Sequence, residues 1–181
     1  MKAMMLQFKE SDIRFWSDKY DALQNQKGRE KEKSLHNFRT DIRQSGFMTK
    51  EQLKVIADWK APRSASHVEK NSADFVKEIT AWSLSAKEER SKIEVLTLLN
   101  GILWPSASVI LHFFHQDPYP ILDWRALNSL GIKNQKQTNQ YSFSFWVMYV
   151  EFCREVAQHN SVDMRTLDKA LWQFSKSKGV Q

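Results

Sequence analysis

Residues 98–111 read Leu-Leu-Asn-Gly-Ile-Leu-Trp-Pro-Ser-Ala-Ser-Val-Ile-Leu, and this stretch decides how the chain is expected to fold. It contains an apolar helix end, a turn at Gly101, and a second apolar helix in which Pro105 falls in the first turn, where proline is tolerated. After a Pro-Tyr-Pro turn at 118–120 the chain continues with an apolar pair and a lone carboxylate, Asp123. The pattern predicts a helical hairpin followed by an acidic residue at the start of another helix.

Composition favours a compact helical domain. The chain has 181 residues, 41% of them hydrophobic, with only 4 Pro and 5 Gly, which is enough to bury a core and leaves long uninterrupted segments. The single cysteine, Cys153, cannot form an internal disulfide, so we expect a buried structural thiol and a reducing compartment. No apolar run approaches the ~20 residues that a bilayer requires. We therefore expect a cytoplasmic protein with no membrane partner.

Helical periodicity runs through nearly the whole chain, and no segment has a convincing strand pattern. Thr49 with Gln52 resembles a capping box, Asp163 is a candidate N-cap, and Gly131 is a candidate left-handed C-cap. We expect two polar connections, a charged face and loop over 24–33 and a loop over 133–140. The formal net charge of +6 is compatible with a polyanionic partner, which it would bind without sequence specificity.

The hairpin and Asp123 together resemble the signature of the helix-hairpin-helix DNA glycosylases. That signature runs Leu-Pro-Gly-Val-Gly-x-Lys-Thr-Ala, then an apolar helix, then a Gly/Pro-containing loop that ends in a catalytic Asp. Gly101 takes the place of the first hairpin glycine and Ser106-Ala107 that of Thr-Ala, with Asp123 at the usual separation from Gly101. Leu103 stands where the family has its second glycine. The motif covers roughly residues 101–125.

The resemblance implies an all-α, two-lobed helical domain of the helix-hairpin-helix DNA glycosylase type. In that family DNA crosses the cleft between the lobes, and the Asp stands at its mouth. On this basis the chain is expected to form a single compact unit over 1–181 with two lobes. The central lobe covers about 62–131 and contains the hairpin at 99–105 and the Asp loop at 117–123. The second lobe combines about 1–60 with 141–178.

The resemblance also implies a function, which is base excision from double-stranded DNA in repair or in defence against modified DNA. Bifunctional members carry a lysine nucleophile where this chain has Pro105, so the expected activity is that of a monofunctional glycosylase, a hydrolase without lyase activity. Asp123 would be catalytic and would activate water for attack on the sugar carbon that bears the base. The alternative is a catalytically inactive helix-hairpin-helix module that binds DNA or serves as an interaction scaffold. Protein partners are not indicated.

Further site residues follow from their positions near the motif. The candidates for contact with the DNA backbone are Asn100, Gly101, Leu103, Trp104, Ser106 and Arg125. The candidates for the base pocket, where aromatic stacking holds an extruded base, are Trp104, Trp124, Trp59 and Arg63. Structural alternatives remain for each of them, because most aromatic residues belong to cores and Asp123 is also a preferred N-cap for a helix that starts at Trp124.

Other chemistries find less support in the sequence. His112 and His115 lie three residues apart with Asp117 nearby, but a fourth ligand is not evident, and satisfied or partly exposed histidines are the favoured interpretation. There is no Gly-rich phosphate loop followed by Lys and Ser/Thr, and no cysteine cluster. We therefore expect no metal, no nucleotide and no other cofactor. The segments 59–63 and 165–172 also resemble those of small bacterial proteins without a described function, which adds no activity.

Overall fold

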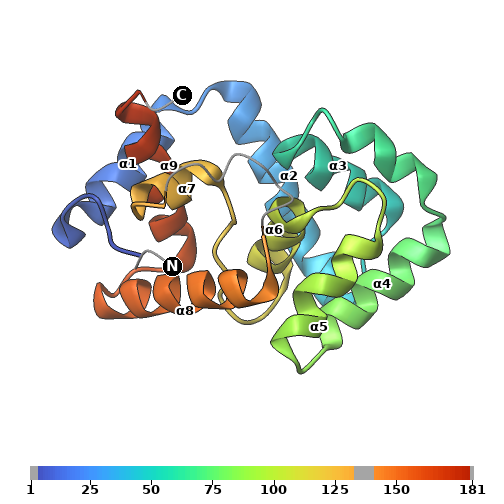
Figure 1. Cartoon of the computed structure of the whole chain (residues 1–181). Coiled ribbons are helices and arrows are strands. Elements are labelled where there is room, and N and C mark those ends of the chain that lie inside the picture. The colour runs from blue at the N-terminus through green and yellow to red at the C-terminus, as the bar shows by residue number, and fades with distance from the viewer. Residues whose placement is uncertain (1–3, 133–140, 180–181) are drawn as a thin grey trace. The chain divides into compact units, whose positions relative to one another are not determined.

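The computed structural model describes residues 4–132 and 141–179, and all regular secondary structure within these ranges is helical. This confirms the predicted all-α class (Figure 1). The segment 133–140, which we expected to be a polar loop, lies outside the described residues. None of the described helices has the length and apolar content needed to cross a bilayer.

The chain forms two compact units, the first from residues 1–24 and 119–181 and the second from residues 25–118. The described helices of unit 1 are η1 (Glu10–Asp12, a 3₁₀ turn), α1 (Ile13–Leu23), α7 (Trp124–Ser129), α8 (Phe143–His159) and α9 (Met164–Ser177). Those of unit 2 are α2 (Gln26–Ser45), α3 (Lys50–Lys60), η2 (Ala65–Lys70), α4 (Ala73–Ser85), α5 (Glu89–Glu94), η3 (Val95–Leu98) and α6 (Trp104–Phe114).

Capping signals in the sequence set several helix ends. Thr49 and Gln52 form the predicted capping box, in which each side chain accepts the other residue's backbone N–H. The Asp163 carboxylate accepts the Thr166 N–H at 2.8 Å and caps α9, as predicted. Gly131 follows α7 with a φ of +76°, the left-handed conformation expected of it. These local interactions explain why the helix boundaries were readable from the sequence.

In unit 1, α9 packs against α1, α7 and α8, and the four helices surround a common core (Figure 1). Trp146, Tyr149 and Cys153 contribute from α8 and are completely buried. Cys153 is thus the buried thiol that we expected, and burial raises its pKa. The N-terminal segment closes over the end of α7, because the Met5 N–H donates to the Leu130 carbonyl at 3.1 Å.

In unit 2, α6 is the most deeply buried helix and packs against α2, α3 and α5. The predicted hairpin between η3 and α6 is held by a buried side chain, Asn71, just before α4. Its Oδ1 accepts the Asn100 N–H at 2.9 Å, and its Nδ2 donates to the Asn100 carbonyl at 3.0 Å. One amide side chain therefore satisfies both backbone groups of Asn100 at the turn.

Residues 24–33 were expected to form a charged face and loop; the solvent-exposed face is present, but the predicted loop is wrong because helix α2 starts at Gln26. The Asn25 side chain accepts the Gly28 N–H at 2.8 Å and caps the helix. One turn along, Gln26 donates to Glu30 at 2.9 Å. Long polar side chains such as those of this segment are good helix formers. Together with the cap they offset the roughly 1 kcal/mol that Gly28 costs in the helix.

The two units divide the chain at other places than the predicted lobes. The helices over 26–60 group with the hairpin in unit 2, because α2 and α3 pack on α6 with Leu35 and Leu53 completely buried. Residues 119–131 belong to unit 1, because α7 packs on α9. Periodicity shows which face of a helix is apolar, but it does not show which other helix covers that face.

Gly101 is the one hairpin residue whose conformation and surroundings both require glycine. Its φ is +84°, and a Cβ at this position would lie 3.0 Å from the Ser64 carbonyl oxygen and 3.1 Å from the Val68 nitrogen. We expect Gly101→Ala to lower the free energy of unfolding by more than the 1–2 kcal/mol or so that a left-handed backbone costs alone. Urea unfolding of the purified protein measures this change.

Gly46 provides the matched control for this substitution. It has a similar φ of +76°, but nothing lies within 4 Å of a Cβ built there. Gly46→Ala therefore carries the backbone cost without the clash, and we expect the smaller loss of stability. Equal losses in the two variants would show that η2 does not press on the hairpin.

Candidate functional site

Asp123 lies at the start of α7 in unit 1, directly after a buried segment. Residues 119–122 are all buried, whereas Asp123 itself is half-buried. Its Oδ1 accepts the Arg125 N–H at 2.8 Å, so the carboxylate is the N-cap of α7. From the sequence, both a capping and a catalytic role were open for Asp123. The structure shows the cap, and a half-exposed carboxylate in this place is compatible with both roles.

Helix α8 fixes the segment that leads to Asp123. The Tyr149 hydroxyl is buried and donates to the Ile121 carbonyl at 2.9 Å. The Tyr119 ring stacks on Trp146, with centroids 5.6 Å apart and planes 13° from parallel. The guanidinium of Arg154, also on α8, lies over the Tyr119 ring, 4.6 Å from its centroid. Asp123 therefore extends from a backbone that packing and hydrogen bonding hold in place.

Tyr141, which the sequence analysis did not select, is a neighbour of Asp123. The pKa of the Tyr141 phenol is raised to about 12. Burial is the larger cause, and the negative charge of Asp123 is the second. The ring of Tyr141 stacks against Phe145 at 5.9 Å. At neutral pH the phenol is protonated, so a hydrogen-bond donor lies within the electrostatic reach of the carboxylate.

Arg125 and Trp124, both predicted site residues, meet a third side chain that was not predicted. The Arg125 guanidinium lies 4.3 Å from the Trp124 centroid and 5.6 Å from that of Trp172 on α9. Trp172 is half-exposed although the helix around it is mostly buried. Its position one turn from both Lys169 and Lys176 is the sequence signal that can identify it, because basic neighbours at helical spacing mark a surface face.

The predicted hairpin residues lie in unit 2, where two of the backbone positions expected to face a ligand are occupied by neighbouring groups. The backbone N–H of Asn100 is already bonded to Asn71, and Gly101 lies against the backbone of η2. Leu103 is 49% exposed and precedes α6, whereas the side chain of Ser106 is buried. Leu98 and Asn100 are exposed as well, so both halves of the hairpin reach the surface. In its second half the first N–H groups of α6 lack intrahelical acceptors.

Trp59 and Arg63 also belong to unit 2, whereas Asp123 belongs to unit 1. The Trp59 ring is half-buried and meets Phe113 edge to face at 5.8 Å, so it packs against α6. Arg63 is exposed in the connection between α3 and η2. The predicted pocket residues are thus divided: Trp124 accompanies Asp123 in unit 1, and Trp59, Arg63 and Trp104 are in unit 2.

The histidines at the end of α6 have structural partners. The buried His115 accepts the Asp117 N–H at its Nδ1, at 3.0 Å, and His112 meets the ring of Phe113 edge to face at 4.9 Å. Among residues 4–132 and 141–179, no group of three or more His, Cys, Asp or Glu side chains is arranged to hold a metal ion.

A groove of about 770 Å³ in unit 2 was not predicted from the sequence. It lies where α2, α4 and α6 end, and its lining includes Arg43, Lys87, Lys92 and His115. Lys92 is buried there between two carboxylates, 3.1 Å from Glu89 and 3.4 Å from Asp117. Burial of an ammonium requires such partners, so a structural role accounts for this ion cluster. None of the predicted site residues lines the groove.

Comparison with known proteins identifies no relative: no family model, no curated protein and no solved structure matches the chain. A function must therefore be argued from the site residues themselves.

Tyr149→Phe tests whether α8 anchors the segment before Asp123. Removing the hydroxyl leaves the buried Ile121 carbonyl without its donor, and we expect the free energy of unfolding to fall by about 1–3 kcal/mol. Hydrogen exchange of the amides in 119–123 is expected to become faster. Ser129→Ala removes another buried hydroxyl that donates to a carbonyl, that of Leu171, and serves as control. If both variants exchange alike in 119–123, Tyr149 is not the anchor.

The raised pKa of Tyr141 gives a spectroscopic test of its proximity to Asp123. Because the folded-state pKa is about 12, above the usual 10.0, the stability linked to this proton is complete below pH 10 and is lost as the pH rises toward 12. We expect Asp123→Asn to lower this pKa without restoring 10.0, since burial is the larger cause. Tyrosinate absorbance, with Tyr141→Phe to identify the signal, measures it. If the Tyr141 pKa is unchanged in Asp123→Asn, the charge of Asp123 does not act on the phenol.

Proposed function

We propose that the chain is a monofunctional DNA glycosylase with the helix-hairpin-helix glycosylase fold. In this proposal it hydrolyses the N-glycosidic bond of a damaged or modified base in double-stranded DNA, and Asp123 activates the attacking water. The motif resemblance over residues 101–125 supports the class of enzyme. The structural support comes from the all-helical architecture and from the environment of Asp123.

The observation that carries the proposal is a half-exposed carboxylate on an anchored segment. Cleavage of a glycosidic bond builds positive charge on the sugar ring, and a carboxylate fixed beneath that ring stabilises the charge while it orients water. Such stabilisation requires a group that does not reorganise during the reaction. Asp123 meets this requirement, because Tyr149 holds the preceding backbone and α7 holds the carboxylate itself.

The chemistry proposed for the hairpin is limited to binding. Pro105 has no side-chain amine, so the hairpin cannot form the Schiff base with the sugar through which lyases cleave the strand. Contact with a DNA phosphate would involve the backbone of Leu103 to Ser106 at the start of α6. The neighbouring Asn100 N–H is engaged by Asn71 and does not take part.

A second candidate function is favoured by the covered hairpin. With Gly101 against η2 and the Leu103 side chain in place of the second glycine, the close backbone approach to phosphate that two glycines permit is restricted. A module that retains DNA binding or a scaffold role without the reaction would be compatible with this geometry. The DNA-binding module differs from the first candidate in base release, and the scaffold differs from both in duplex binding.

Base release from a panel of duplexes tests the proposal. The duplexes carry alkylated, oxidised, deaminated and hypermodified bases, and mass spectrometry detects the free base. We expect Asp123→Asn to reduce release by about 10²-fold or more, because it removes the group that activates water. Asn is as good an N-cap as Asp, so the folding of α7 should be retained.

Asp163→Asn is the matched control, since Asp163 caps α9 in the same unit by an equivalent hydrogen bond to the backbone. Release at the native rate from Asp123→Asn would remove Asp123 from the mechanism. Absence of release from every duplex, with binding retained, would favour the inactive module.

A further inference from the structure

An aromatic and basic surface covers the place where α1, α7 and α9 of unit 1 meet. Four of its side chains come from α9 at intervals of four, three and four residues, so they share one face of that helix. Helices α1 and α7 supply the others. The aromatic–basic stripe is defined by Tyr20, Trp124, Arg125, Arg165, Lys169, Trp172 and Lys176.

A cationic side chain lies over each aromatic ring of the stripe, and the contacts within the stripe connect all of its residues. Arg125 lies 4.3 Å from the Trp124 centroid and 5.6 Å from that of Trp172. The ammonium of Lys176 lies 4.8 Å from the Trp172 centroid. Tyr20 meets Trp172 edge to face at 5.3 Å, which links α9 to α1. These aromatic contacts hold the basic side chains in defined positions.

The remaining two cations of the stripe gather around Tyr20. Arg165 donates to the Tyr20 hydroxyl at 3.3 Å, and the Lys169 ammonium lies 5.8 Å from the ring centroid. Each also has a carboxylate partner: Asp168 pairs with Arg165, and Asp21 pairs with Lys169 at 2.8 Å. With Asp123 at its end, the stripe has four cations and three carboxylates, so its formal charge is positive.

Lys176 is the cation of the stripe that is most available to a ligand. It is exposed, and it makes no ion pair with any of the described residues. Because cations already lie over the indole rings, the stripe presents charge and hydrogen-bond donors more than open ring faces. Its complement is an anion such as phosphate, and a stacked base is a poorer match.

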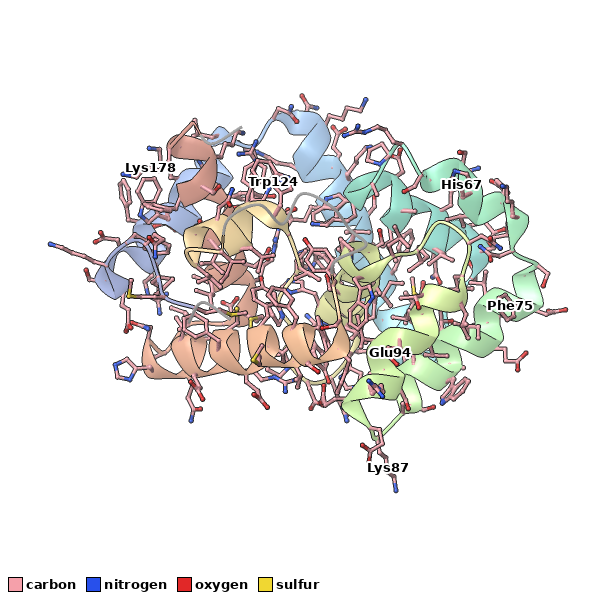
Figure 2. All side chains as sticks on the ribbon, in the orientation of Figure 1. His67, Phe75, Lys87, Glu94, Trp124 and Lys178 are labelled. Atoms are coloured by element: carbon pink, nitrogen blue, oxygen red, sulfur yellow. The ribbon has the colours of Figure 1, made fainter. Side chains whose placement is uncertain are left out.

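The stripe begins at the proposed catalytic carboxylate. The backbone N–H of Arg125 is bonded to Asp123, and Trp124 lies between them in sequence, at the start of α7 (Figure 2). Resting on the proposed function, we infer that the aromatic–basic stripe binds the sugar–phosphate backbone of a DNA strand next to the nucleotide on which Asp123 acts. All residues of this surface belong to unit 1.

The length of the stripe favours a nucleic-acid strand over an acidic protein surface. From Arg165 to Lys176 the helix advances about 16 Å at 1.5 Å per residue. One strand of B-DNA carries a phosphate for about every 3.4 Å of the duplex axis and winds around that axis, so more than one phosphate of a strand falls within that length. A regular row of anions can thus meet several cations of one helix face at once, whereas the carboxylates of a protein have no fixed spacing.

The salt dependence of DNA binding by Lys176→Ala tests the inference. The probe is a fluorescent duplex without a modified base, titrated with the full-length protein at several salt concentrations. Losing one phosphate contact is expected to reduce the slope of log K against log salt by about 0.9 and to weaken binding roughly fivefold to tenfold at 0.1 M salt. Adding Lys169→Ala should reduce the slope further.

Lys77→Ala is the matched control, because Lys77 is also an exposed lysine over an aromatic ring, 5.7 Å from the Phe47 centroid, but lies on α4 of unit 2. A slope that falls for Lys176→Ala and not for Lys77→Ala supports the inference. The inference is overturned if the native protein, Lys176→Ala and Lys77→Ala all have the same slope of log K against log salt. It is also overturned if poly-L-glutamate of the same charge binds as tightly as DNA and loses as much affinity on Lys176→Ala, since the stripe would then fit an acidic polypeptide.

The failure of this inference is distinguishable from that of the proposed function, because binding and base release are measured separately. Stripe-dependent binding without release by the native protein would retain the stripe and reject the glycosylase. Release that depends on Asp123, with binding indifferent to Lys176, would retain the glycosylase and reject the stripe.

Discussion

The hydrogen bond from Tyr149 to the Ile121 carbonyl is the constraint on which the candidate site depends. A segment without helical hydrogen bonds can be buried only if its polar backbone groups find other partners. In unit 1 a hydroxyl from α8 provides such a partner, and Tyr119 and Trp146 stack beside it. The chain therefore reaches Asp123 along a defined path. A carboxylate at the end of a mobile loop would lose most of its electrostatic advantage to reorganisation.

In unit 2 the backbone groups of the hairpin also need hydrogen-bond partners, and a different kind of side chain provides them. Asn71, distant in sequence, binds both the N–H and the carbonyl of Asn100, while Gly101 adopts a left-handed conformation against η2. The same interactions that stabilise the turn also occupy part of its surface. Stability and phosphate binding thus compete for the same few backbone atoms, and the N–H groups at the start of α6, next to the exposed Leu103, are what remains for a ligand.

What the sequence could predict was local. Helical periodicity, the capping box at Thr49 and the cap at Asp163 depend on residues a few positions apart, and the structure confirms them. Features that depend on distant partners were not predictable. The clearest case is Asn71, which looks like an ordinary residue before a helix until the hairpin lies against it. For Trp172 the lysines at helical spacing indicate a surface position, but its contact with Arg125 depends on the packing of α7 on α9.

The complete burial of Cys153 has a practical consequence. A thiol reagent can react only with a thiolate that it can reach, and here burial both blocks access and raises the pKa. Alkylation must therefore wait until the helices around α8 separate. The chain has a single cysteine, and it lies in unit 1. The rate at which a thiol reagent labels the native sequence therefore reports how often that unit opens, without any substitution.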